Sequence, residues 1–119
     1  MSVRVQLKGV ILAGNTSGNG PECSGLLTSQ GYNLIGNNAG CTFTAQSTDI
    51  TGQDPLLGPL ANNGGPTQTH LPKAGSPVLD QVPTTDCTTL DGTALSTDQR
   101  GVSRPQGLAC DIGAVERQP

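Results

Sequence analysis

The feature that most constrains this sequence is a spacing of about 22 residues between short aliphatic segments. Aliphatic triplets stand at residues 12–14, 34–36, 56–58 and 78–80. Each triplet is too short to bury an apolar surface alone, so it must stack on its neighbours in the repeat. The spacing predicts a solenoid in which the first residue of each triplet joins one continuous internal column: Leu12, Leu34, Leu56 and Val78.

The composition predicts that this solenoid is all-β. Hydrophobic residues make up 33% of the 119 residues and aromatic residues 2%, which suits a thin core better than a compact one. The 17 glycines and nine prolines, with many Thr, Ser and Asn, favour turns and short strands over helix. We expect coils of about 22 residues over 1–83 and a loop-rich capping segment over 84–119, together forming a single domain.

Charge and hydropathy exclude two classes of partner. Six Lys and Arg residues, scattered along a chain of net charge −3, cannot neutralise a row of nucleic acid phosphates. The longest apolar run, 10–13, is far too short to span a bilayer, so we expect no transmembrane segment. The opening residues lack the apolar core of a signal peptide, and we interpret Met1 as the boundary of a fragment of a longer protein.

Four cysteines predict a disulfide framework: Cys23, Cys41, Cys87 and Cys110. Their spacing lacks the two-residue gap of a metal site or a redox motif, which disfavours zinc. We prefer the local pairing, first with second and third with fourth, because each pair encloses one turn-rich excursion. Such bridges stabilise a fold by roughly 3 kcal/mol each and imply export to an oxidising space. The alternative is four unpaired thiols in a cytosolic protein.

Two asparagines occupy the same phase of consecutive repeats. Asn15 and Asn37 each follow a glycine, and stacked asparagines at a solenoid corner can bond one another's amides. Asn also tolerates the left-handed backbone of such corners. The alternative is that both residues merely favour turns.

Several motifs, in order, resemble the choice-of-anchor Q domain, the C-terminal region of bacterial surface proteins that are similar to pectin-lyase-like and polymorphic outer-membrane repeats. The resemblance covers 25–116 and implies a right-handed parallel β-helix in an exported, cell-surface or secreted protein, with no established catalytic activity. No anchor is visible before Pro119, so the resemblance does not indicate how the protein is attached. The motifs that carry it are Tyr-Asn-Leu-Ile-Gly at 32–36, Asp-Pro-Leu-Leu-Gly at 54–58, Leu-Ala-Asn-Asn-Gly-Gly-Pro at 60–66, His-Leu at 70–71, Gly-Ser-Pro-Val-Leu-Asp at 75–80, Asp-Gln-Arg-Gly at 98–101, Arg-Pro at 104–105 and Asp-Ile-Gly-Ala-Val-Glu at 111–116.

The charged residues near the C-terminus are the best candidates for a site: Asp98, Arg100, Arg104, Asp111 and Glu116. Guanidinium groups bind carboxylates in a fixed fork, so we predict that the two arginines clamp the terminal loop to Asp111 or Glu116. The alternative is a polysaccharide-lyase site, where a base removes a proton beside a uronate carboxylate. A terminal cap is a poor place for such a site, and we favour the clamp.

Other polar residues have structural interpretations. His70, the single histidine, follows a turn and is expected to be a hydrogen-bonded strand residue. Asp54 and Asp80 precede or follow Pro-containing turns and are expected to bond nearby backbone amides, although calcium at stacked aspartates is an alternative. Threonine rows at 42–44 and 67–69 are out of register with the repeat, which disfavours an ice-binding face.

We therefore predict a non-catalytic structural or adhesive module outside the cell, with no metal and no cofactor. Its expected partner is a cell-surface component, a glycan or another copy of the chain, joined head to tail through an unpaired strand edge. The alternative is a fragment of a carbohydrate-active β-helix enzyme.

Overall fold

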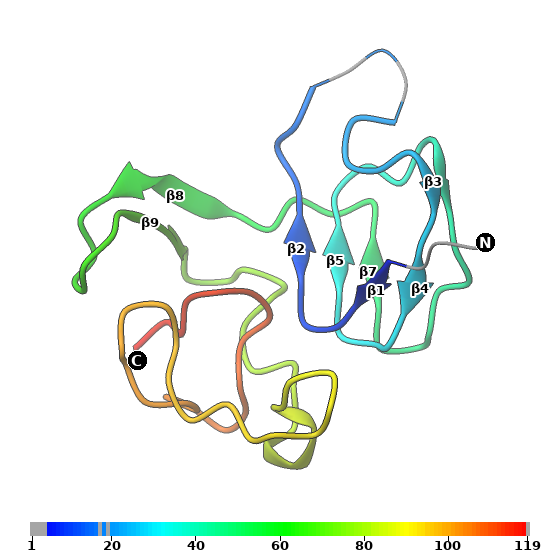
Figure 1. Ribbon diagram of the computed structural model, residues 1–119. Helices are drawn as coiled ribbons and strands as arrows, with labels where there is room; N and C mark the ends of the chain where they lie inside the picture. Colours follow the sequence, from blue (N-terminus) through cyan, green and yellow to red (C-terminus); the bar gives the residue numbers. More distant parts are fainter. Residues whose placement is uncertain (1–4, 17, 19, 119) are drawn as a thin grey trace.

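The computed structural model describes residues 5–16, 18 and 20–118. Met1, interpreted above as a fragment boundary, lies outside these residues. Figure 1 shows a stack of short strands on one side and a hairpin with long loops on the other. The strands are β1 (Gln6–Leu7), β2 (Ile11–Leu12), β3 (Gly25–Leu26), β4 (Thr28–Ser29), β5 (Leu34–Ile35), β6 (Cys41–Thr42), β7 (Ile50–Thr51), β8 (Leu57–Ala61) and β9 (Thr69–Pro72). One short 3-10 helix, η1 (Thr84–Asp86), is the only helical segment among the described residues, so the predicted all-β character is confirmed.

Three small parallel ladders make up the first part, which we call the ladder region (residues 5–52). Strands pair as β1–β4, β3–β6 and β2–β5–β7, all parallel. Gln6 lies opposite Thr28, 22 positions on, and Ile11 lies opposite Leu34, 23 positions on. The next step is shorter, because Leu34 lies opposite Ile50, 16 positions on. The predicted interval of about 22 residues therefore describes the first step of the stack but not the second.

After the ladder region the chain changes its mode of pairing. β8 and β9 form an antiparallel hairpin where the spacing predicts another parallel coil. Two features of the sequence explain the change. Asn62-Asn63-Gly64-Gly65 begins the turn-rich loop 62–68, with Gly64 and Gly65 at φ +98° and +78°, and Pro55 and Pro59 remove backbone donors that a parallel ladder would use. Among the described residues, parallel pairing ends at Thr51.

The predicted aliphatic column does not form as predicted. Leu34 and Val78 are fully buried and face each other in the core, but Leu56 is 39% exposed and has a left-handed backbone, φ +53°. Leu12 stands opposite Ile35, so Ile11 takes the place beside Leu34. Side chains alternate between the two faces of a strand, and a slip of one residue therefore exchanges the inward and outward sets.

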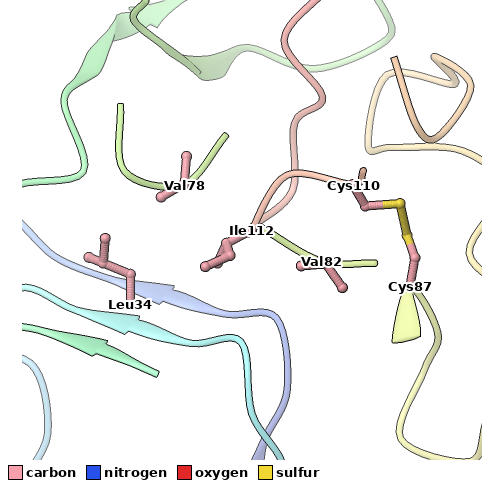
Figure 2. Close-up of a cluster of buried hydrophobic side chains, with 6 residues drawn as sticks. All are labelled: Leu34, Val78, Val82, Cys87, Cys110 and Ile112. Carbon is pink, nitrogen blue, oxygen red and sulfur yellow. A yellow bond between two sulfur atoms is a disulfide. The ribbon is translucent and has the colours of Figure 1, made fainter. Parts of the chain in front are cut away.

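The core joins the ladder region to the second part, the cap region (residues 73–118). Figure 2 shows Leu34 of β5 near Val78, Ile112 and Val82, with a disulfide at the far end of the cluster. That disulfide links Cys87 to Cys110, and the other links Cys23 to Cys41, with Cα–Cα distances of 6.2 and 5.2 Å. The local cysteine pairing is confirmed. None of the helical structure in the described residues is long or apolar enough to cross a bilayer.

Candidate functional site

The charged residues of the cap region come together at one buried place. A turn over 98–101 is closed by a hydrogen bond from Gly101 N–H to the Asp98 carbonyl, 3.0 Å. The Asp98 carboxylate then accepts the N–H groups of Arg100 at 2.7 Å and Val102 at 3.1 Å. An aspartate at the start of a turn commonly bonds the backbone in this way, so the local sequence itself fixes this carboxylate.

Arg100 holds the turn against two other segments. Its Nε and Nη2 atoms bind the Asp98 Oδ2 atom at 3.0 and 2.9 Å. Its remaining donors bind the carbonyl of Asn63 at 3.0 Å and that of Glu116 at 2.5 Å. The predicted clamp by Arg100 therefore exists, but its ionic partner is Asp98 instead of Asp111 or Glu116. The carboxylate two residues away is already oriented by the turn, so it is the nearest acceptor.

Arg104 makes the predicted contact with Glu116. Its Nη1 atom lies 2.9 Å from the Glu116 Oε2 atom, and its Nη2 and Nε atoms bind the carbonyls of Gly113 at 3.0 Å and Thr97 at 3.1 Å. One guanidinium fork thus ties three loop segments together. The prediction that an arginine clamps the terminal loop to Glu116 is confirmed.

Glu116 is the most deeply buried ionisable group of the cluster. It is 0% exposed, its Oε2 atom also accepts the Asp111 N–H at 2.8 Å, and its Oε1 atom has no hydrogen-bond partner among the described residues. Burial, together with the nearby charge of Asp111, raises its pKa to about 7 despite the contact with Arg104. The loss of hydration on burial therefore changes the pKa of Glu116 more than the attraction of the Arg104 guanidinium does.

The other two carboxylates of the cluster are held by backbone donors. Asp111 accepts the N–H groups of Asp80 at 2.8 Å and Arg117 at 2.7 Å, and burial with the charge of Asp80 raises its pKa. Burial also acts to raise the pKa of Asp98, but hydrogen bonds from Glu116 N–H and from Arg100 outweigh it and the pKa falls. Most acceptors of the cluster are thus occupied by the protein's own backbone.

This arrangement leaves little for a substrate to contact. The Arg100 and Arg104 side chains are only 6% and 9% exposed, and their forks bind the carboxylates and carbonyls described above. The cavity that touches Arg104 and Asp111 holds about 50 Å³, room for one or two water molecules and not for a sugar ring. Among the described residues, no group of three or more His, Cys, Asp or Glu side chains could hold a metal ion.

The remaining predicted residues lie elsewhere. His70 is exposed on β9, with its Nδ1 atom 2.8 Å from the Gly58 carbonyl, as expected of a hydrogen-bonded strand histidine. Asp54 accepts the Leu56 N–H at 2.8 Å, which confirms its predicted turn. Asp80 does not form the same turn, because its own backbone is left-handed, with φ +55°. Its carboxylate faces the loop 107–109, where the Ala109 N–H donates to the Asp80 Oδ1 atom at 3.4 Å.

The predicted stack of Asn15 on Asn37 does not form among the described residues. Asn15 donates to Glu22 at 2.9 Å, and Asn37 accepts the Ala39 N–H at 3.0 Å, so each stabilises its own turn; no bond between the two is formed in the described structure.

The buried asparagine of the ladder region is Asn33, which is 1% exposed. It accepts the Val10 N–H at 3.0 Å and donates to the Leu7 carbonyl, to Ser29 and to Asp49. Sequence reasoning missed it. The available signal was one polar residue inside the otherwise apolar stretch Tyr-Asn-Leu-Ile.

Comparison of the chain with protein-family models, with curated proteins and with solved structures gives no match.

Proposed function

We propose that the chain is a non-catalytic structural or adhesive module that acts outside the cell. In this proposal the three parallel ladders are coils of a right-handed parallel β-helix, and the cap region closes it near the C-terminal end of a bacterial surface protein of the choice-of-anchor Q type. Parallel pairing at offsets of 22 and 23 residues supports the β-helix. Two disulfides support an oxidising, extracellular environment.

The single observation that carries the proposal is the inward orientation of the charged cluster. Catalytic groups of a lyase must face a cleft wide enough for a sugar chain and within hydrogen-bond reach of it. Here Arg100 and Arg104 bind carbonyls and carboxylates of the protein, and Glu116 is fully buried. Such contacts order loops that have few strands of their own, which is the task of a structural clamp.

Substitution of Arg100 separates the structural function from the enzymatic one. We expect Arg100→Ala to lower the melting temperature by several degrees, because the Asn63 and Glu116 carbonyls lose a side-chain donor and the Asp98 carboxylate loses its cation. Both proteins are also incubated with polygalacturonate, and the unsaturated uronate product is followed by its absorbance. Neither protein should release it. Lys73→Ala, an exposed cation in a turn, is the matched control and should change nothing.

Two results would favour the alternative, a carbohydrate lyase. The first is product release by the wild-type chain that disappears in Arg100→Ala. The second is an unchanged melting temperature in that variant, which would show that the clamp is not structural. Arg100→Lys, which keeps the charge but loses the fork, protects the test against a variant that fails to fold.

Self-association belongs to the same proposal. Gly52 N–H bonds the Ile35 carbonyl at 3.0 Å and Ile50 N–H bonds the Asn33 carbonyl at 2.8 Å, so the N–H and C=O of Thr51 between them point out of the ladder. An outer edge of this kind can accept a strand of another copy. Size-exclusion chromatography at several concentrations tests this: end-to-end growth predicts a rising mass, whereas a concentration-independent monomer rejects it.

A further inference from the structure

A second feature of the molecule is an open cleft away from the charged cluster. It holds about 600 Å³ and lies between β2, the β8–β9 hairpin and the segment 112–115. Figure 1 shows β2 as the edge of its sheet that faces the hairpin and the cap region. The lining is mainly aliphatic, with Leu57, Leu60 and Ile112 among its residues, and it contains no Asp, Glu, Lys or Arg. A charged ligand would therefore lose its hydration there without gaining a partner.

One wall of the cleft is a strand edge. Leu34 N–H bonds the Val10 carbonyl at 2.8 Å, and Gly36 N–H bonds the Leu12 carbonyl at 2.9 Å. Successive backbone groups of a strand point to opposite sides, so those of Ile11 and Ala13 point away from β5. They make no hydrogen bond to another described residue. Both residues line the cleft.

The cap region approaches one end of this edge. Gly113 N–H bonds the Gly9 carbonyl at 3.0 Å, two residues before β2 begins, so the cap region contacts the chain at one end of this edge. The chain then turns away, since Ala114 bonds Gln99 and Val115 is buried. The next backbone groups along the edge, those of Ile11 and Ala13, are left facing the cleft.

We propose that this cleft binds an extended, uncharged peptide segment, which adds as a strand to the outer edge of β2. The backbone of the segment pairs with Ile11 and Ala13 and continues the β2–β5–β7 ladder. Alternate side chains of the segment, small and aliphatic, lie against Leu57 and Ile112. Strand addition of this kind takes affinity from backbone hydrogen bonds and selectivity from the pockets between alternate side chains. None of the clamp residues lines this site.

The test uses the whole chain with both disulfides intact and a capped five-residue peptide of alternating valine and threonine. We expect saturable binding by calorimetry and slower hydrogen exchange at the Ile11 and Ala13 amides when the peptide is present. A capped peptide of alternating lysine and threonine is the control and should not bind. Failure of the first peptide to bind at millimolar concentration, or equal binding of both, overturns the proposal.

Two substitutions separate strand addition from simple apolar adsorption. Ala13→Pro removes one N–H that faces the cleft while leaving the edge in place, and we expect affinity to fall about fivefold, the equivalent of one hydrogen bond. Ala114→Trp fills the cleft and should abolish binding, whereas Ala45→Trp, at an exposed alanine outside the cleft, should not.

Each variant is used only if it melts at the same temperature as the wild-type chain. If Ala13→Pro does not fold, Ala114→Trp still tests the proposal. Unchanged affinity in folded Ala13→Pro contradicts backbone pairing. If the wild-type chain is instead a dimer that Ala114→Trp converts to a monomer, the cleft belongs to a second copy and the peptide assignment is wrong.

Discussion

The ladder region and the cap region are held together by different physical means. In the ladder region, short parallel strands pair through the backbone, and the uncharged Asn33 amide bonds the Val10 N–H and the Leu7 carbonyl. In the cap region regular pairing is reduced to isolated bridges, such as Val82 with Cys110, and arginine forks bind loop carbonyls directly. Where backbone pairing is sparse, buried arginine side chains donate hydrogen bonds to the loop carbonyls. We therefore expect the stability of the cap region to depend on pH and on single charged side chains.

Loss of Arg104 should give the largest effect and break the cap region first. Arg104→Ala leaves Glu116 buried without its cation and frees the Gly113 and Thr97 carbonyls. We expect the free energy of unfolding to fall by about 3–5 kcal/mol at pH 8, measured by urea denaturation. Lys73→Ala, exposed in its turn, should change it by less than about 0.5 kcal/mol. Equal effects in the two variants would show that the clamp is not stabilising.

Truncation of Leu34 tests the ladder region by the same method. Leu34 is 0% exposed and contacts the core that joins the two regions (Figure 2), so Leu34→Ala should cost about 2–5 kcal/mol through lost burial and a residual cavity. Leu26, on β3, is 62% exposed, and Leu26→Ala is the matched control. A large loss in the control and none at Leu34 would mean that the inward and outward faces of the ladders are exchanged.

The pH dependence of stability should come from the cap region. Glu116 has a pKa of about 7 in the folded chain and 4.5 ordinarily, so the folded state binds its proton more tightly. The stability that Glu116 contributes is therefore fully present below about pH 4.5 and is lost as the pH rises through about 7, by at most about 3 kcal/mol. Asp111, whose pKa is also raised, acts in the same direction.

The measurement is a series of urea denaturations between pH 5 and pH 8. Glu116→Gln, which cannot ionise, should flatten most of the slope in this range. If the stability of Glu116→Gln changes with pH as steeply as that of the wild-type chain, the pH dependence comes from another group.

The junction between the two regions should give the smallest effect. Asp54 bonds the Leu56 N–H where the chain leaves the ladder region for the hairpin, so Asp54→Ala should cost about 1 kcal/mol. Asp54→Asn keeps the acceptor and should recover most of that loss. Thermal unfolding followed by circular dichroism resolves a difference of this size, and identical curves for Ala and Asn would show that the turn bond contributes nothing.

Features that depend on residue type were predictable from the sequence. Turn-rich composition indicated an all-β chain, compact cysteine spacing indicated the two local disulfides, and the charged residues near the C-terminus indicated a clamp that includes Arg104 and Glu116. Each of these depends on chemistry that acts over short range or between strongly complementary groups.

Features that depend on register were not predictable. A period near 22 cannot distinguish Ile11 from Leu12 as the partner of Leu34, and a one-residue slip exchanges the two faces of a strand. The hairpin was missed because the aliphatic pair at Leu56 and Leu57 fits the repeat, although only Leu57 lies in the hairpin strand β8. The buried role of Asn33 depends on its contacts with Leu7, Val10 and Asp49, whose register the spacing does not determine.

A double-mutant cycle between Arg104 and Glu116 tests the central claim most directly, because it measures their interaction apart from other losses. The wild-type chain, Arg104→Ala, Glu116→Gln and the double variant are unfolded in urea at pH 8, where the carboxylate is ionised. We predict a coupling free energy of at least about 1.5 kcal/mol. Single-variant losses that add to within about 0.5 kcal/mol would contradict a structural clamp.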